Sequence, residues 1–159
     1  MESRISLKDF FGNEATGFTP WLQHHCVIIQ DILNDSDICF YKREAKVDDF
    51  YIDLMFHKNK EVYVVENQYG ESNHDHLGKC IVYSALTNAK KTVWIAEKIL
   101  AEHQKILDKL TIDLYLCEIS LKKIGEKTEM KIYCYSRNKF KQLIYILDKN
   151  KEIIRRIGV

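Results

Sequence analysis

Several features that mark common protein classes are missing from this chain. Its 159 residues include only one proline and six glycines, and they contain no internal repeat, low-complexity tract or linker-like segment. A chain of this length can bury one full core but not two ordinary ones. We therefore expect a single domain that spans residues 1–159.

Signals for membranes, secretion and two large hydrolase classes are also absent. No hydrophobic run reaches the roughly 18 residues of a membrane-spanning helix. The N-terminal MESRISLKDFFGNE lacks the basic head and apolar core of a secretory signal. There is no G-x-x-x-x-G-K-[ST] phosphate loop and no nucleophile elbow. The first two absences predict a protein without a membrane partner, which agrees with the cytoplasmic location that the unpaired cysteines predict.

The cysteines are few, odd in number and scattered. No two of the five stand at C-x-x-C spacing, so neither a zinc knuckle nor a redox pair is indicated. Each lies in an apolar run, where a free cysteine behaves as a small core residue. The composition, with 46% hydrophobic and 30% charged residues, is that of a globular protein in a reducing compartment.

Charge is nearly balanced overall but unevenly distributed. The formal net charge is +1, which does not by itself indicate a nucleic-acid partner. Residues 1–40 carry a net charge of −4, whereas residues 137–159 carry +5. A basic C-terminal segment can follow phosphates, and solvated charge on a terminal segment is an equally good interpretation.

Hydrophobic periodicity predicts an α/β protein in which a central mixed sheet is flanked by helices. A first helix is expected from Thr19, as its cap, with Pro20 in the first turn. A second should follow a cap at Ser72 or Asn73 and run to Thr87. The order is α-β-β-β-α-β-α-β-β, with strands at 38–47, 50–58, 61–68, 91–97, 111–125 and 127–136, and further helices at 101–110 and 138–148. Residues 1–10 and the last eleven receive no assignment.

Two strands, FYIDLMFHK (50–58) and EVYVVENQ (61–68), are separated by a turn at Asn59-Lys60. This turn places Asp53 across from Glu66 and Tyr51 across from Gln68. Directly opposed carboxylates repel, so a pair among apolar neighbours needs a cation or a shared proton.

Oxygen ligands of this kind favour Mg²⁺ or Mn²⁺ over zinc. The alternative is that Asp53 and Glu66 lie on an exposed sheet edge, each solvated or paired with a lysine.

Four motifs occur in a fixed order along the chain: NEATGFTPWL (13–22), VVENQ (64–68), NHDHLGK (73–79) and KTVWIAE (91–97). Together they resemble a prokaryotic subfamily of the PD-(D/E)XK nuclease superfamily, over roughly residues 13–125. The basic segment 137–159 lies outside this resemblance. The resemblance implies a restriction-endonuclease-like core and Mg²⁺-dependent cleavage of nucleic acid.

The resemblance also implies roles for individual residues. Asp53 and Glu66 match the metal ligands, and Glu14 matches an additional acidic ligand found in some of these nucleases. Gln68 stands where the general pattern has lysine, and it would orient water or metal. Lys79, at a helix position where relatives have glutamine, is hypothesised to supply the missing ammonium group.

Three further residues are candidates for contact with nucleic acid. His74 and His76 lie at a predicted helix N-terminus, where phosphate is favoured, and their i, i+2 spacing argues against one shared zinc ion. Tyr83 is interpreted either as core or as the edge of the site. Trp21 and Trp94 are expected in the core.

The sequence therefore predicts a metal-dependent nuclease that uses Mg²⁺ or Mn²⁺ and acts on DNA ahead of RNA. The alternative is a nucleic-acid-binding or assembly domain that keeps the fold without cleavage. A structural partner of a larger complex is a third, weaker option. By analogy alone, a homodimer is expected.

Overall fold

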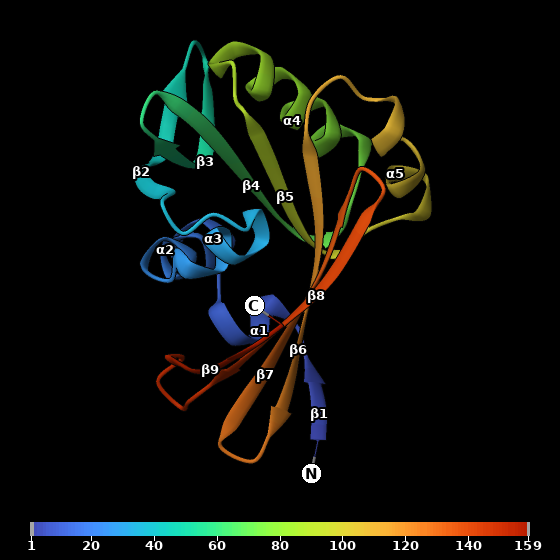
Figure 1. The fold of residues 1–159 in the computed structure, drawn as a ribbon. Coiled ribbons are helices and arrows are strands. Elements are labelled where there is room, and N and C mark those ends of the chain that lie inside the picture. The colour runs from blue at the N-terminus through green and yellow to red at the C-terminus, as the bar shows by residue number, and fades with distance from the viewer. Residues whose placement is uncertain (1, 159) are drawn as a thin grey trace.

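The computed structural model describes residues 2–158, which form one large mixed sheet flanked by helices (Figure 1). The strand order is β2-β3-β4-β5-β6-β7-β8-β9, and β1 pairs with β6 outside this path. Pairs β4–β5 and β5–β6 are parallel, whereas the other pairs are antiparallel. The strands are β1 (Glu2–Ile5), β2 (Cys39–Val47), β3 (Phe50–Lys58), β4 (Glu61–Glu71), β5 (Lys91–Lys98), β6 (Leu114–Ile124), β7 (Lys127–Ser136), β8 (Lys139–Leu147) and β9 (Ile153–Ile157).

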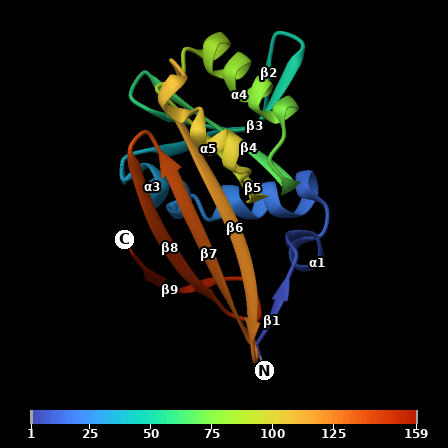
Figure 2. The ribbon, with the colours of Figure 1, turned by 90° about the vertical axis from the view of Figure 1, so that its right-hand side faces the viewer.

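Helices cover both faces of the sheet (Figures 1 and 2). The main core lies on one face, under α1 (Leu7–Phe11), the π-helical turn η1 (Glu14–Phe18), α2 (Thr19–His24) and α3 (Val27–Leu33). Two smaller apolar clusters lie on the other face, under α4 (His74–Thr87), α5 (Ala101–Lys105) and the 3₁₀ turn η2 (Leu107–Lys109). The predicted mixed α/β architecture, a central sheet flanked by helices, is confirmed. No helix within residues 2–158 is long and apolar enough to cross a membrane.

The β3–β4 hairpin follows the predicted register along most of its length. Asn59 takes a left-handed conformation (φ 56°) at the turn, as a short-chain polar residue can. Pairing then runs from Lys58–Glu61 to Leu54–Val65. The β3–β4 ladder ends at that pair, and Tyr51 and Gln68 are paired only with their outer neighbours, Lys46 of β2 and Ala96 of β5. The predicted opposition of Tyr51 and Gln68 is therefore wrong.

The segment predicted as a helix at 138–148 is a strand, β8. Its buried residues, Leu143, Tyr145 and Leu147, alternate with half-buried ones, which is the period of a strand. The apolar residues in this stretch fit both a helical and an alternating pattern. Antiparallel pairing with β7 from Ser136–Lys139 to Thr128–Leu147 decides for the strand. The unassigned ends also form strands, β1 and β9.

The N-terminal helical region begins earlier than predicted. Asn13, not Thr19, supplies the cap: its side chain accepts hydrogen bonds from the N–H groups of Ala15 and Thr16. The chain is already helical when it reaches Thr19, and Pro20 lies in the first turn of α2 as predicted. In the second predicted helix, Asn73 is the cap and the helix ends at Thr87, which confirms both bounds.

Two other expectations need correction. The predicted helix 101–110 is α5 followed by η2, because the α-helix ends at Lys105. The expectation that every cysteine is a core residue is wrong for Cys39, which is exposed, and for Cys26, which is half-buried. The other three cysteines are buried, and all five are free thiols.

Gly17 provides the first testable prediction. A Cβ atom at this position would lie 1.9 Å from the carbonyl oxygen of Phe11, and backbone cannot move aside cheaply. Gly17→Ala should therefore lower the free energy of unfolding by about 2 kcal/mol or more. In α4, a Cβ on Gly78 would meet nothing within 4 Å. Gly78→Ala should therefore raise the free energy of unfolding by up to about 1 kcal/mol. Urea unfolding of both variants tests this, and equal effects would contradict it.

Candidate active site

Asp53 and Glu66 lie where strands β3 and β4 separate. The last ladder pair is Leu54–Val65, so the two acidic residues come directly after it and not, as predicted, within it. Where the main-chain ladder ends, a side chain accepts the next hydrogen bond: the N–H of Asn67 donates to Asp53 Oδ2 at 2.8 Å. The Asp53 carboxylate is thereby fixed against β4, one residue from Glu66.

Glu14 brings a third carboxylate to the same strand end. The cap at Asn13 starts the η1 turn, and Glu14 is its first residue. Its Oε2 accepts a 3.0 Å hydrogen bond from the N–H of Tyr69, while the Tyr69 hydroxyl donates to the carbonyl of Gly12 at 2.8 Å. These two bonds hold the N-terminal motif against the end of β4, 55 residues away in sequence.

Burial dominates the electrostatics of these three carboxylates. Glu66 is only 4% exposed, and its Oε2 is a buried atom without a hydrogen-bond partner among the described residues. Burial, and next the charge of Asp53, raise the pKa of Glu66 far above its ordinary value. Burial also raises the pKa of Asp53 and of Glu14. Buried carboxylates of this kind are costly unless a cation or a proton compensates them.

Lys79 is the nearest source of positive charge that the structure identifies. It is an exposed residue of α4, and its charge lowers the pKa of Glu14, Asp53 and Glu66, partly offsetting burial. Within the described chain no ion pair under 4 Å joins Lys79 to a carboxylate. Its ammonium group therefore acts on all three carboxylates from more than 4 Å.

Gln68 is engaged by the protein at both ends of its amide. Its Oε1 accepts a 3.0 Å hydrogen bond from Trp94 Nε1, and its Nε2 donates to the carbonyl of Glu71. Gln68 is 5% exposed and Trp94 is fully buried. The side chain thus fixes the end of β4 to β5 and faces the protein interior.

Glu66, Asn67 and Gln68 are consecutive residues of β4 that contact different parts of the protein. Asn67 points to the opposite face of the sheet, where its Nδ2 donates a 3.0 Å hydrogen bond to the hydroxyl of Thr19 in α2. Both residues are buried. One tripeptide therefore supplies a carboxylate to the site, a bond to helix α2 and a bond to strand β5.

The three candidates for nucleic-acid contact lie along α4 but differ in exposure. His74 is exposed and His76 is half-buried, at the start of the helix. Burial lowers the pKa of His76, and the charge of Lys79 adds to this effect. Tyr83 is 4% exposed and packs in an apolar cluster with Met55 and Val64. Burial, and next the charges of Glu66 and Asp53, raise the pKa of its hydroxyl, so this core residue also borders the site. Trp94 is core as expected, while Trp21 is half-buried and stacks on His25.

Sequence reasoning missed a buried polar cluster beside the site. Ser72 Oγ lies 2.6 Å from His103 Nδ1, and His103 Nε2 lies 2.9 Å from His74 Nδ1. Ser72 and His103 are 1% and 2% exposed, and the Ser72 hydroxyl also accepts from the N–H of Leu100. His103 lies 31 residues from Ser72, inside a polar-rich segment, so no spacing signal connects them.

The donor chemistry of the site fits a hard divalent cation, although the described residues contain no ready-made group of three His, Cys, Asp or Glu ligands. The Asp53 and Glu66 carboxylates interact electrostatically, and the unpartnered Glu66 Oε2 is buried, where a cation or a proton would compensate the negative charge. Mg²⁺ is commonly held by one or two carboxylates, with water and phosphate completing its shell. Two protein ligands are therefore sufficient for this ion.

No family model matches the chain, and no curated protein matches it by sequence. The fold is similar to a repair endonuclease from Pyrococcus abyssi, with a TM-score of 0.46 and 11% identity, over 57% of this chain and 43% of that one. It is also similar to Pyrococcus furiosus SfsA in complex with Ca²⁺, with a TM-score of 0.41 and 17% identity, over 62% of this chain and 57% of that one. The matched part is less than two thirds of either protein, and at these scores neither likeness assigns a function.

The buried Glu66 carboxylate predicts an unusual pH dependence of stability. Glu66 binds its proton more tightly in the folded state, so the free energy of unfolding should fall as pH rises from its ordinary pKa of 4.5 towards the raised value. The isosteric Glu66→Gln removes the buried charge, and it should flatten this decline and stabilise the protein by about 1–3 kcal/mol near pH 8.

Urea unfolding in chelator between about pH 5 and pH 8 measures the effect. Glu126→Gln, an exposed residue in the β6–β7 turn, is the matched control and should leave the pH profile unchanged. Identical profiles for wild type and Glu66→Gln would contradict the buried, uncompensated carboxylate.

Proposed function

We propose that this protein is a metal-dependent nuclease that hydrolyses phosphodiester bonds, with DNA ahead of RNA as substrate. The observation that carries the proposal is the buried Glu66 carboxylate, which has one unpartnered oxygen and lies beside Asp53 at a strand end. The four-motif resemblance to PD-(D/E)XK nucleases supports the same assignment, because each motif contributes a residue that contacts or surrounds this strand end. The preference for DNA, the homodimer and the cytoplasmic location stay predictions.

Asp53 and Glu66 would hold the ion, Mg²⁺ or Mn²⁺, and Glu14 would complete the acidic surroundings. The ion, when bound, would neutralise charge at the phosphate and lower the pKa of a bound water. The main-chain N–H of Asn67 keeps the Asp53 carboxylate in place, and that of Tyr69 does the same for Glu14. This fixed arrangement reduces the reorganisation needed when substrate arrives.

Lys79 would stabilise negative charge that develops on the phosphate. Its charge already acts on all three carboxylates, and its position on α4 leaves the ammonium group exposed to a ligand. Gln68 would act as a positioning residue, because both polar atoms of its amide are bonded to the protein. Lys79 would thus supply the charge that the family pattern places at the position of Gln68.

A second function, binding of nucleic acid without cleavage, is favoured by a specific observation. Gln68 replaces the usual lysine and is turned towards Trp94, and the described residues present no complete three-ligand metal group. A domain of this kind would keep the fold and the basic groups, and it would bind nucleic acid without cleaving it. The same assay separates the two functions.

Cleavage of labelled single- and double-stranded DNA and RNA, with Mg²⁺ or with chelator, provides the test. Glu66→Gln should reduce the rate by about 10³-fold or more because it removes a metal ligand. Lys79→Gln should reduce it by roughly 10–10²-fold, since one stabilising charge is lost. Lys60→Gln, an exposed lysine at the opposite end of the β3–β4 hairpin, should have no effect.

The possible outcomes separate the assignments clearly. Cleavage that persists in chelator or in Glu66→Gln would identify a contaminating nuclease and remove support for the proposal. Binding without cleavage by the wild-type protein would establish the second function. Unchanged cleavage by Lys79→Gln would refute the role of this lysine while leaving the metal site intact.

A further inference from the structure

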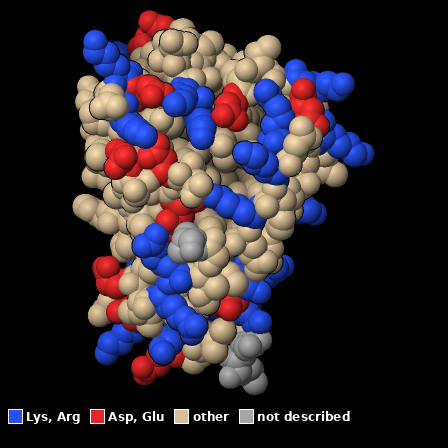
Figure 3. All heavy atoms as spheres, in the orientation of Figure 1, with Lys and Arg blue, Asp and Glu red and all other residues tan. Residues whose placement is uncertain are grey.

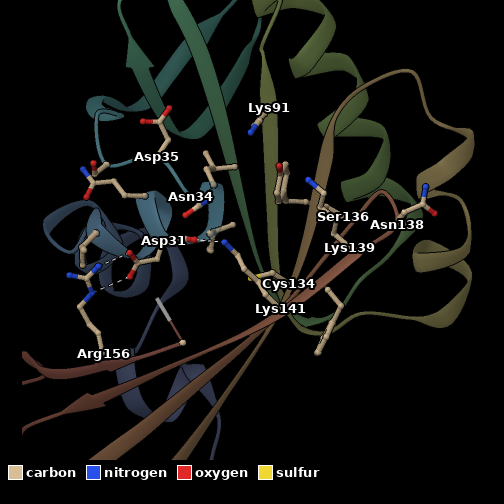
Figure 4. Close-up of a pocket in the computed structure, with 18 residues that line it drawn as sticks. Asp31, Asn34, Asp35, Lys91, Cys134, Ser136, Asn138, Lys139, Lys141 and Arg156 are labelled. Carbon is tan, nitrogen blue, oxygen red and sulfur yellow. Dashed lines mark hydrogen bonds and ion pairs between the residues drawn. The ribbon is translucent and has the colours of Figure 1, made fainter.

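A cavity of about 1040 Å³ lies between helix α3 and the ends of strands β5 to β8, a size at the upper end of common ligand pockets. One wall comes from α3 and the loop that follows it, and the other from the start of β5, from β6 and from the β7–β8 turn (Figure 4). Figure 3 shows Lys and Arg side chains gathered beside a hollow near the middle of the molecular surface in that view. The lining residues used below are Asp31, Asp35, Lys91, Tyr115, Lys139, Lys141 and Arg156.

This cavity is separate from the candidate active site because it lies on the other face of the sheet. Lys91 lies on the same face of β5 as Val93 and Ile95, which belong to the main core under α2 and α3. Trp94, the neighbour of Glu66 in the parallel ladder, points to the face covered by α4. The lining of the cavity therefore shares no residue with the carboxylate site.

The acidic side chains of the cavity are already neutralised by the protein. Asp31 Oδ1 and Oδ2 bind the Arg156 guanidinium at 2.6 and 3.2 Å, and Oδ2 also accepts from the Tyr145 hydroxyl at 2.7 Å. Asp35 pairs with Lys58 at 2.8 Å. Neither carboxylate therefore needs a further cation.

Among the described residues, the three lysines of the lining, unlike Arg156, form no such ion pair. Within the described chain, no ion pair under 4 Å is formed by Lys91 or Lys139, and Lys91 lies over the ring of Tyr115 at 5.5 Å. Lys141 donates its hydrogen bond to the main-chain carbonyl of Asp31, which carries no formal charge. Four cations against two carboxylates give the lining a net charge of +2. This net positive charge favours the binding of an anion.

We propose that this cavity binds the phosphate of a nucleotide, with Lys91, Lys139 and Lys141 as its cationic contacts. The volume exceeds what an inorganic ion needs, and a phosphate is the common biological anion that lysine binds as a point charge. Tyr115 supplies an aromatic surface next to the lysines. The site accounts for part of the basic segment 137–159, because Lys139, Lys141 and Arg156 all belong to that segment.

Titration calorimetry of the full chain in chelator tests the proposal with three probes: inorganic phosphate, a nucleoside 5′-monophosphate and a short single-stranded oligonucleotide. Chelator removes phosphate binding through a metal at the carboxylate site. The monophosphate should bind saturably, and Lys91→Ala or Lys139→Ala should each weaken binding about tenfold. The double variant should show no saturable binding. Lys149→Ala, an exposed lysine outside the cavity, should bind as wild type does.

The probes also identify the source of the phosphate. Monophosphate binding at least as tight as that of the oligonucleotide assigns a free nucleotide. Lysine-dependent binding of the oligonucleotide alone assigns a nucleic-acid strand. Absence of saturable binding with all three probes at millimolar concentration would overturn the proposal. Wild-type affinity in both Lys139→Ala and Lys139→Gln, with unchanged unfolding midpoints, would overturn it equally.

Discussion

The candidate active site is governed by one constraint, the burial of the Glu66 carboxylate. Glu66 is almost fully enclosed, and one of its oxygens has no hydrogen-bond partner among the described residues. A fold tolerates such a group only when a proton, a nearby cation or a bound ion offsets the lost hydration. Asp53 and Glu14 make this requirement stronger, because they add negative charge at the same strand end. These carboxylates therefore lower the free energy of unfolding when no cation is bound, as they do at functional sites in general.

Hydrogen bonds join three of the four short motifs at the end of β4, and the remaining motif, NHDHLGK, contributes the charge of Lys79. Glu14 of the first motif binds the main chain at Tyr69, and Thr19 of the same motif binds Asn67. Trp94 of the last motif binds Gln68. These bonds fix the strand end from both faces of the sheet, so that the carboxylates project from a rigid element. A site held in this way loses little energy to rearrangement when a ligand binds.

Local signals predicted the centre of the fold well and its edges poorly. The Asn59-Lys60 turn determined the hairpin register and the cap at Asn73 defined the start of α4, because both signals depend on nearby residues. Segment 138–148 was assigned to the wrong class because its apolar residues satisfy two periods, and only pairing with β7 selects the strand. The Ser72–His103 bond and the cavity beside α3 bring together segments that are far apart in sequence, and no local sequence pattern predicts such contacts.

The central claim is that Asp53 and Glu66 together bind a divalent cation. A crystal soaked with Mn²⁺ and measured near the manganese absorption edge tests it most directly. An anomalous peak is expected within bonding distance of Glu66 Oε2 and of an Asp53 carboxylate oxygen, with waters completing the shell. A crystal that shows ordered carboxylates and no such peak, or a manganese ion bound only elsewhere, would contradict the account.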